Sequence, residues 1–570
     1  MKKSILLLAS AFLCTSAFAE NYFITPAGCG AGDGSSWEDA AAGADINDIL
    51  SGLEPGDNVY FMAGTYGGAS TDIVPGLTVI GGFPTTAKGA DISGYDPVAN
   101  LTLFDCEGKN VNAAKAYVRV VAGDDQKELV TTIKGITISG AKSILSADGS
   151  NSRSNPHIVG SAFYCSNAKV ILEDVVFKGN TSAVGGVVVA GENSKFLAKH
   201  CKWIDNVNDY WTQFPEAGPG FTAVCFTALP SIVINPGRTT SILDGCVFTG
   251  NKIDGDSKNK SKWGGLINIV DRTNNKDYSA MSYSDLIAVN NIFDGGELEI
   301  FQKGACLRQG MRSYILLAYN TFYGFRASDP ALGTTISFHG DNVLTYMGCN
   351  IVVDNSATID NNYAIGLDNN LRSSSDTFAY TSTSFGYNTV SGTTPNKKPE
   401  SFFAVATDQW NVVDGEATVF GGNKLTAKGN TMVIEPVKAY ADVKMAEVND
   451  AFKATNFPND FLEVFGDKYN VDLTVDITGA KRSATTYRGA YDPSAQGAGS
   501  GIGEIASSSE ELSIVRIAKD IYRLNGGSAK VYNVAGQVVC TDANGIIDLT
   551  TVSTGIYIIS SNGKSHKVVK

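Results

Sequence analysis

One short phrase returns along the chain, and it restricts the possible folds more than any other feature. FKGN at 177–180 recurs as WIDN at 203–206 and as FTGN at 248–251. Each phrase follows a short apolar triplet whose alternation indicates a strand, with the first and third residues on one face. The positions that close these triplets are Phe177, Trp203, Phe248, Phe293, Phe322, Val352 and Val390.

The spacing of these strands indicates a repeat architecture. Successive aligned positions lie 26, 45, 45, 29, 30 and 38 residues apart. A coil of that size cannot bury its own apolar face, whereas stacked coils bury one against the next. Strand repeats with Gly and Asn turns and little amphipathic helix therefore predict an all-β parallel β-helix, in which the longer gaps are coils with inserted loops.

The residues just after these strands are expected to form corners. Gly-Gly pairs at 185–186 and 264–265 allow backbone angles that other residues avoid. Asn180, Asn206 and Asn251 suit left-handed corners and are expected to stack as a ladder of amides. We therefore interpret the repeated phrase mainly as a structural device.

Longer stretches resemble known families. GSAFYCSNAKVILEDVVFKGN (160–180) and GGVVVAGENSKFLAKHCKWIDN (185–206) resemble the repeats of polymorphic outer membrane proteins, although Val187 replaces the usual alanine. The phrases at 33–66 and 476–493 are similar to the first and closing coils of secreted right-handed parallel β-helix proteins with a pectin lyase-like fold. The resemblance covers about residues 21–493 and implies this fold, but no activity.

The ends of such a stack must be covered, because each end exposes unpaired backbone groups. We expect a helical cap around Trp37 to Leu53. The stretch 443–466 is the second helical region, expected at the far end of the stack. Asp476 and Arg482 are candidates for an ion pair inside the last coil.

The chain divides into five predicted parts. Residues 1–19 read as a signal peptide, with Lys2 and Lys3, an apolar run and a cut after Ala19. The N-terminal cap spans 20–56, the β-helix 57–493, a Gly/Ser-rich linker 494–509 and a small antiparallel β-sandwich 510–570. After the signal peptide, we expect no transmembrane segment.

The last part resembles the type A C-terminal sorting domain of the type IX secretion system of Bacteroidetes. The residues of this resemblance named here are Gly536, Gly555, Tyr557, Lys567, Val568, Val569 and Lys570. The resemblance implies secretion across the outer membrane, to the cell surface or the medium, with the type IX secretion machinery as a partner.

Charge and cysteine usage exclude several functions. The net charge of −13 becomes −15 when residues 1–19 are removed, because they hold two lysines and no acid. An acidic chain is a poor partner for nucleic acid, which needs a basic face. Nine cysteines remain, none in a C-x-x-C pair, and the histidines are scattered; we expect buried thiols and no metal site of usual spacing.

Candidate catalytic residues are few. Elimination from an acidic sugar chain needs a base and a cation. Asp271, Arg272, Arg308 and Arg312 are the weak candidates, and we favour pairing of Arg308 and Arg312 with Glu297 and Glu299. Hydrolysis would need two carboxylates, for which we find no repeated pair. We expect no cofactor; calcium is a weak alternative at Asp254 and Asp256, where Lys258 replaces a ligand.

A binding surface is the third hypothesis. The insertion 207–221 carries Tyr210, Trp211 and Phe214, and Trp263 follows another insertion. Aromatic side chains on loops are suited to sugar rings or protein surfaces, although they also pack back as lids. The leading expectation is a non-catalytic, adhesin-like protein that binds glycan or host matrix through inserted loops. A polysaccharide lyase or glycoside hydrolase and a structural spacer are the alternatives.

Overall fold

The computed structural model divides the chain into two compact units, within residues 1–499 and 500–570. Residues 1–18 of the predicted signal peptide lie outside the described residues, so the signal peptide remains a prediction. In several strands only the backbone is described. The described residues are 19–67, 71–106, 110–111, 117–143, 161–182, 186–191, 193–208, 224–228, 238–253, 265–271, 283–296, 298–300, 304–309, 314–327, 335–339, 344–354, 365–368, 382–386, 389–392, 403–405, 415–418, 424–428, 431–433, 441–492, 495, 513–518, 521–525, 530–533, 538–541, 546–550, 552, 556–561 and 564–569.

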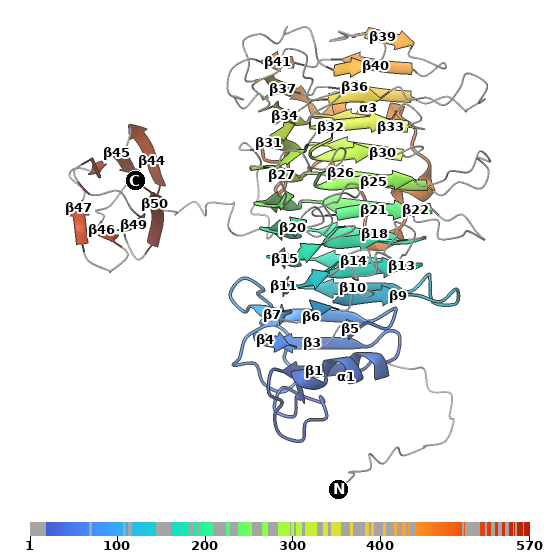
Figure 1. Ribbon diagram of the computed structural model, residues 1–570, viewed down its shortest axis with the longest axis vertical. Helices are drawn as coiled ribbons and strands as arrows, with labels where there is room; N and C mark the ends of the chain where they lie inside the picture. The colour runs from blue at the N-terminus through green and yellow to red at the C-terminus, as the bar shows by residue number, and fades with distance from the viewer. Residues whose placement is uncertain are drawn as a thin grey trace. The chain divides into compact units, whose positions relative to one another are not determined.

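Long parallel sheets build the first unit, and their strands follow one another in chain order along the stack except at the two ends of the longest described sheet (Figure 1). Within the described residues, sheet A has the strands β2 (Ala41–Ala42), β1 (Asn21–Thr25), β3 (Asn58–Met62), β6 (Thr78–Phe83), β10 (Val130–Lys134), β14 (Lys169–Glu173), β18 (Lys195–Lys199), β22 (Arg238–Asp244), β26 (Tyr283–Val289), β30 (Tyr314–Ala318), β33 (Leu344–Gly348), β36 (Ser382–Gly386), β40 (Lys424–Lys428) and β39 (Gly415–Thr418). Only β39 pairs antiparallel in this sheet.

Three further sheets complete the coils. Sheet B contains β4 (Gly64–Gly67), β7 (Thr102–Asp105), β11 (Ile136–Ser139), β15 (Val176–Lys178), β19 (Lys202–Ile204), β23 (Val247–Thr249), β27 (Ile292–Asp294), β31 (Thr321–Ala327), β34 (Ile351–Asp354), β37 (Thr389–Gly392) and β41 (Thr431–Val433), with β28 (Glu299–Ile300) beside β31. Sheet C contains β38 (Phe403–Val405), β35 (Ile365–Asp368), β32 (Ile336–His339), β29 (Leu307–Gln309), β25 (Ile267–Asp271), β21 (Val224–Ala228), β17 (Val188–Ala190), β13 (Phe163–Ser166), β9 (Val118–Val121) and β5 (Thr71–Asp72). The short sheet D contains β24 (Lys252–Ile253), β20 (Val207–Asn208), β16 (Thr181–Ser182), β12 (Lys142–Ser143) and β8 (Asn110–Val111).

The predicted register of the repeat is confirmed. Phe177 pairs with Trp203, Trp203 with Phe248 and Phe248 with Phe293 in sheet B. The register continues through Phe322 and Val352 to Val390. The five aromatic rings are buried and stack at centroid distances of 5.2, 4.5, 4.9 and 4.8 Å. The chain is therefore a parallel β-helix whose core includes this aromatic column.

The predicted amide ladder is also present. The side-chain oxygen of Asn206 accepts from the backbone and side-chain amides of Asn180 at 3.0 and 3.1 Å, and Asn251 accepts in the same way from Asn206. The predicted left-handed conformation of these asparagines is wrong. It belongs to the residues just before them, Gly179, Asp205 and Gly250, with φ of 62°, 53° and 66°. The asparagine side chains point inward and are buried, so the preceding residue makes the bend.

A second ladder lies where sheet A turns into sheet B. Asn291, Asn320 and Asn350 repeat the same amide pattern, and the backbone amide of Cys246 joins it at 2.7 Å. Gly265 belongs to one of the Gly-Gly pairs that were predicted to form corners. Its backbone packs closely against the next coil, because a Cβ there would collide with the carbonyl oxygen of Ala305.

The N-terminal end contains the predicted helix. A short 3-10 turn, η1 (Gly43–Asp45), leads into α1 (Ile46–Gly52), which buries Ile46 and Leu50. Trp37 lies in a separate cluster with Phe23, Tyr60 and Phe83. Figure 1 shows α1 beside β1 at the N-terminal end of the stack.

The second helical region does not cover the far end of the stack, contrary to our expectation. We call residues 441–492 the flank segment. It contains β42 (Ala441–Lys444), α3 (Met445–Ala454), α4 (Asn459–Leu462), the 3-10 turn η5 (Gly466–Lys468) and β43 (Thr485–Tyr487). Its Val448 and Phe461 pack on an outward-facing apolar column of sheet A: Ile171, Leu197, Ile242, Ile287, Leu316 and Tyr346. This column needs burial, and the flank segment provides it.

The expected Asp476–Arg482 ion pair is absent from this segment. Arg482 instead donates to the carbonyl oxygens of Val475, Gly489 and Ala490, and to the side-chain oxygen of Asn290 at 3.0 Å. Its guanidinium also lies 3.9 Å from the ring centroid of Tyr319. Arg482 thus fastens the flank segment to a corner of the β-helix.

The second unit is antiparallel, as predicted. One sheet contains β44 (Ser513–Ala518), β45 (Ile521–Asn525) and β48 (Ile546–Asp548), and the other contains β47 (Val538–Thr541), β46 (Lys530–Asn533), β49 (Ile556–Ser561) and β50 (Lys564–Val569). Val531, Ile547, Leu549, Tyr557 and Ile559 form its core. No helix among the described residues of the chain is long and apolar enough to cross a membrane.

Candidate functional site

Most of the residues predicted to bind or react lie outside the described residues. These are Tyr210, Trp211, Phe214, Trp263, Arg272 and Arg312, together with Asp254 and Asp256 of the suspected calcium loop. Asp271 ends β25, where only its backbone is described. Arg308 is half-buried in β29, in register with Asn268 and Ser337. Of the four candidate catalytic residues, only Arg308 has a described side chain, so their grouping and their role stay predictions.

The sorting residues are described in part. Gly536, Gly555 and Lys570 lie outside the described residues, and Lys567, Val568 and Val569 are described only as backbone of β50. Tyr557 is buried in the core of the second unit. A core position explains Tyr557 structurally and leaves its sorting role a prediction.

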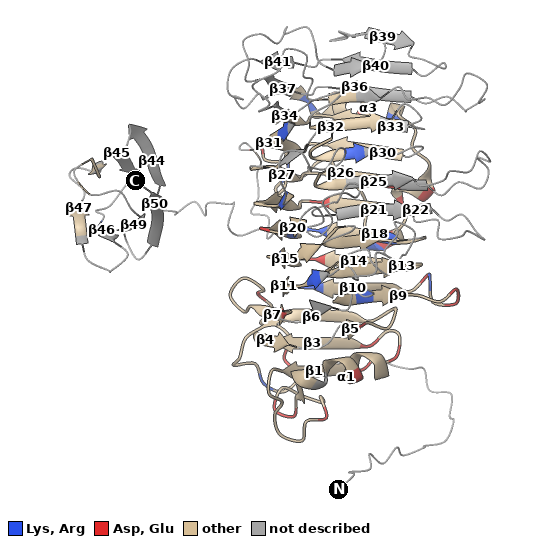
Figure 2. Cartoon of the chain, in the orientation of Figure 1, with Lys and Arg blue, Asp and Glu red and all other residues tan. Residues whose placement is uncertain are grey.

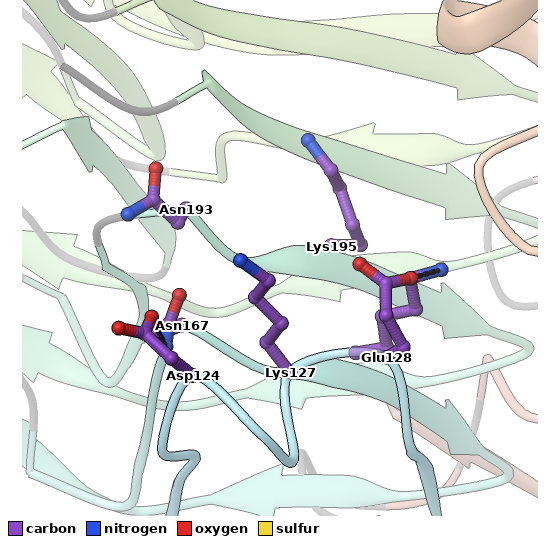
Figure 3. A pocket seen from close by; sticks show the side chains of 7 residues that line it. Asp124, Lys127, Glu128, Asn167, Asn193 and Lys195 are labelled. Atoms are coloured by element: carbon purple, nitrogen blue, oxygen red, sulfur yellow. Dashed lines mark hydrogen bonds and ion pairs between the residues drawn. The ribbon is translucent and has the colours of Figure 1, made fainter. Parts of the chain in front are cut away.

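A polar hollow of about 340 Å³ opens on the first unit, where sheet C turns into sheet A. Its lining residues are Asp124, Lys127, Glu128, Asn167, Lys169, Asn193 and Lys195. Figure 3 shows Lys127 between Asp124 and Asn167 on one side and Glu128 on the other. We call this site the lysine hollow.

Two consecutive coils supply four of the seven residues that line the lysine hollow, and they do so with the same local structure. Asn167 and Asn193 take left-handed backbone angles, with φ of 51° and 55°, just before β14 and β18. Asparagine tolerates this conformation better than most residues. Lys169 and Lys195 follow two positions later and are in-register partners on the outer face of sheet A. The two coils therefore place two amides and two ammonium groups in matching rows.

The turn between β9 and β10 supplies the opposite wall. The side-chain amide of Asn167 donates to the carbonyl oxygen of Ala122 at 3.1 Å and to a carboxylate oxygen of Asp124 at 3.5 Å, which holds this turn against the coil. Lys127 and Glu128 then extend from the same turn.

The charges of the lysine hollow are only partly paired. Lys169 contacts Glu128 at 2.6 Å, and this hydrogen bond lowers the pKa of the Glu128 carboxyl group. Lys127 is exposed and forms no ion pair within the described part of the chain. Three lysines face two carboxylates, so the site carries one excess positive charge although the whole chain is acidic. In Figure 2, blue and red segments lie close together around β10, β14 and β18.

This arrangement suits an anion that also carries hydroxyl groups. Ammonium groups bind carboxylates through charge-assisted hydrogen bonds, and amides both donate to and accept from hydroxyl groups. Metal binding finds no comparable support, because no group of three His, Cys, Asp or Glu side chains in the described ranges is arranged to hold an ion. The chemistry of the lysine hollow is therefore that of recognition.

The lysine hollow was not predicted from the sequence, although the sequence contains a signal for it. Asn-x-Lys occurs at 167–169 and again at 193–195, which is 26 residues later and equals the spacing of Phe177 and Trp203. A polar motif repeated at the period of the coil must lie in a row on one surface. Lys127 and Glu128 carry no such signal, because they come from a turn outside the repeat.

Comparisons with known proteins give limited likenesses. No protein family model matches this sequence, and no curated protein sequence does. Among solved structures, pectate lyase Bsp165PelA from Bacillus sp. N165, in complex with trigalacturonate, is 11% identical with a TM-score of 0.26, over 76% of this chain and 92% of that one. Tailspike protein 3 of bacteriophage CBA120 is 9% identical with a TM-score of 0.25, over 70% of this chain and 62% of that one. The strand register of the chain itself establishes the fold.

Proposed function

We propose that this protein is an exported parallel β-helix protein that binds a carboxylated glycan at the lysine hollow. The observation that carries the proposal is the matched rows of Asn167, Asn193, Lys169 and Lys195 opposite the exposed Lys127. Because the amide and ammonium groups repeat from one coil to the next, they suit a ligand made of repeating units, such as a polysaccharide. The insertion with Tyr210, Trp211 and Phe214, and Trp263, are proposed to add stacking surfaces for sugar rings.

The export proposal is supported by the two ends of the chain. The basic and apolar start ends in Ala17-Phe18-Ala19, a small-x-small cleavage motif. The C-terminal unit is a separate antiparallel fold, which is compatible with a removable sorting domain. We propose that the type IX secretion machinery reads this unit and that the β-helix acts at the cell surface or in the medium.

The test measures binding of the full chain to polygalacturonate and alginate, with dextran as a neutral glycan. We expect binding to both polyuronates, weakened by added salt because exposed charges are screened. The double variant Lys127→Ala/Lys195→Ala should bind about tenfold more weakly, which corresponds to a loss of about 1.4 kcal/mol.

Lys178→Ala/Lys202→Ala is the matched control, because it also removes two lysines, from β15 and β19 in sheet B. Equal weakening by this control would mean that only net charge matters. If the chain bound none of the three polysaccharides, the structural spacer would be the better description.

A further inference from the structure

The lysine hollow contains a carboxylate of its own chain at the place where its positive charges converge. Glu128 contacts the ammonium group of Lys169 at 2.6 Å, and the dashed line beside Glu128 in Figure 3 marks this contact. The hydrogen bond and the charge of Lys169 lower the pKa of the Glu128 carboxyl group most, and the charges of Lys127 and Lys195 lower it further. All three lysines that line the hollow therefore act on this one carboxylate.

The backbone that carries Glu128 is held by its own hydrogen bonds. Lys127 and Glu128 are the two central residues of a turn, which the amide of Leu129 closes by donating to the carbonyl oxygen of Gln126 at 2.9 Å. Just upstream, the amide of Gln126 donates to the carbonyl oxygen of Gly123 at 3.0 Å. The turn therefore does not need the side chain of Glu128 to keep its shape.

The two partners of the contact differ in their freedom to move. Lys169 is the first residue of β14, which pairs with β10 on one side and β18 on the other. The side chain of Lys169 is 22% exposed, whereas that of Glu128 is 73% exposed. Glu128 can therefore rotate into solvent while the backbone of both residues stays in place, which leaves the ammonium group of Lys169 to another carboxylate.

The second acid of the hollow has a different role. A carboxylate oxygen of Asp124 accepts from the side-chain amide of Asn167 at 3.5 Å. None of the ion pairs formed between described residues includes Asp124. Of the two carboxylates that line the hollow, Glu128 is thus the one that occupies an ammonium group.

A carboxylate that is attached to the site competes strongly with one that arrives from solution. A group on a short link meets its partner at an effective concentration on the order of millimolar. Every carboxylated ligand that binds through Lys169 loses the same factor in affinity by displacing Glu128. A chain of uronates contacts several ammonium groups at once, so it keeps a useful affinity where a single uronate does not.

We propose that Glu128 is a built-in competitor of the lysine hollow, which a carboxylate of the glycan must displace from Lys169 in order to bind. This inference rests on the proposed function and deepens it, because it states how the same site is regulated. In the free protein the hollow is closed to single carboxylates by its own acid. In the complex the ligand carboxylate takes the place of Glu128, whose side chain points into solvent.

The experiment measures the affinity of the full chain for polygalacturonate at low ionic strength, where exposed charges are least screened. Glu128→Gln keeps the size of the side chain and removes its charge. We expect this variant to bind about two- to fivefold more tightly than the wild type, the range that an exposed ion pair allows. Urea unfolding of each variant shows whether it folds.

Asp125→Asn is the matched control, because Asp125 is exposed in the same turn and does not line the hollow. It removes the same charge and should change the affinity little. An equal gain in both variants would mean that only net charge matters and would overturn the competitor. Weaker binding by Glu128→Gln would overturn it too, since Glu128 would then help to hold the ligand.

A double-mutant cycle with Lys169→Gln tests whether Glu128 acts through Lys169. In the Lys169→Gln background, Glu128→Gln should gain no more affinity than Asp125→Asn does. A full gain without Lys169 would contradict the displacement.

The two proposals fail in different ways. Unchanged affinity in folded Glu128→Gln would overturn the competitor and leave the proposed function intact. If neither the wild type nor Glu128→Gln bound polygalacturonate, the proposed function itself would fail, and the competitor with it.

Discussion

At the scale of single residues, buried polar groups in this β-helix are placed by the period of the coil. Asn206 is completely buried and uses both ends of its amide. It donates to the carbonyl oxygen of Phe177 at 2.9 Å and to Asn251 at 2.9 Å, while it accepts from Asn180. Such a network is stabilising only when every member is satisfied.

We predict that Asn206→Ala lowers the free energy of unfolding by roughly 3 kcal/mol or more. The change leaves the amide of Asn180 and the carbonyl oxygen of Phe177 buried without partners, at about 1–3 kcal/mol each. Urea unfolding measures the loss. Asn470→Ala is the control, since Asn470 is exposed and does not have a left-handed backbone conformation. Similar losses in both variants would contradict the ladder's role.

Asp244 predicts a pH dependence of stability. Burial raises the pKa of its carboxyl group from 3.8 to about 6, against the lowering effects of Lys199, Tyr469 and Asn290. Because the folded pKa is above the unfolded one, this group favours the folded state most at low pH. Its contribution is lost as the pH rises from about 4 to about 6.

Asp244→Asn should therefore stabilise the protein above pH 6 and change little below pH 4. The gain is at most about 3 kcal/mol, and less because water reaches part of this side chain. Urea unfolding at pH 3.5 and pH 8 tests the prediction, with the exposed Asp205→Asn as the control. A gain of equal size at both pH values would contradict it.

At the scale of elements, the flank segment decides which part of sheet A is accessible. It covers the outward column from Ile171 to Tyr346, and the half-buried Val130 of β10 packs against the same cluster. The lysine hollow lies at one end of β14 and β18, at the border of this cover. The flank segment contributes none of the residues that line the lysine hollow.

We predict that Phe461→Ala loosens the flank segment. Phe461 is fully buried, with ring centroids 5.5 Å from Tyr314 and 4.9 Å from Phe457, and truncation of a buried phenylalanine costs about 3–5 kcal/mol. Hydrogen exchange should increase in α3, α4 and the outer strands from β18 to β33. Lys453→Ala, which is exposed on α3, is the control. Unchanged exchange in Phe461→Ala would show that Arg482 and its partners hold the segment alone.

At the scale of the whole molecule, the two units have separate cores. The β-helix core and the core around Val531 and Tyr557 share no residue. Each unit should thus fold without the other.

We predict that residues 20–499 alone unfold at the same urea concentration as the first unit of the full chain and bind polyuronate with the same affinity. Binding to the polyuronate would be measured for both forms side by side. A large loss of stability or affinity on removal of 500–570 would contradict the independence of the units and the proposal that the second unit is a removable sorting domain.

The sequence by itself determined the architecture of this protein, because a β-helix repeats one local pattern. Phe177, Trp203 and Phe248 recur at the coil spacing, so their stacking and the amide ladder of Asn180, Asn206 and Asn251 followed from alternation and period alone. The antiparallel character of the tail also followed from its short strands and turns.

Only the tertiary structure decided where the chemistry lies. Tyr95 meets Asp174 across 79 residues, and Arg482 meets Asn290 across 192. Neither of these sequence separations is a multiple of the repeat spacing, so no local sequence pattern predicts the two contacts. Lys127 likewise comes from a turn outside the repeat. The helices of the flank segment were recognisable from the sequence, but the surface on which they pack is an apolar column made by six separate coils.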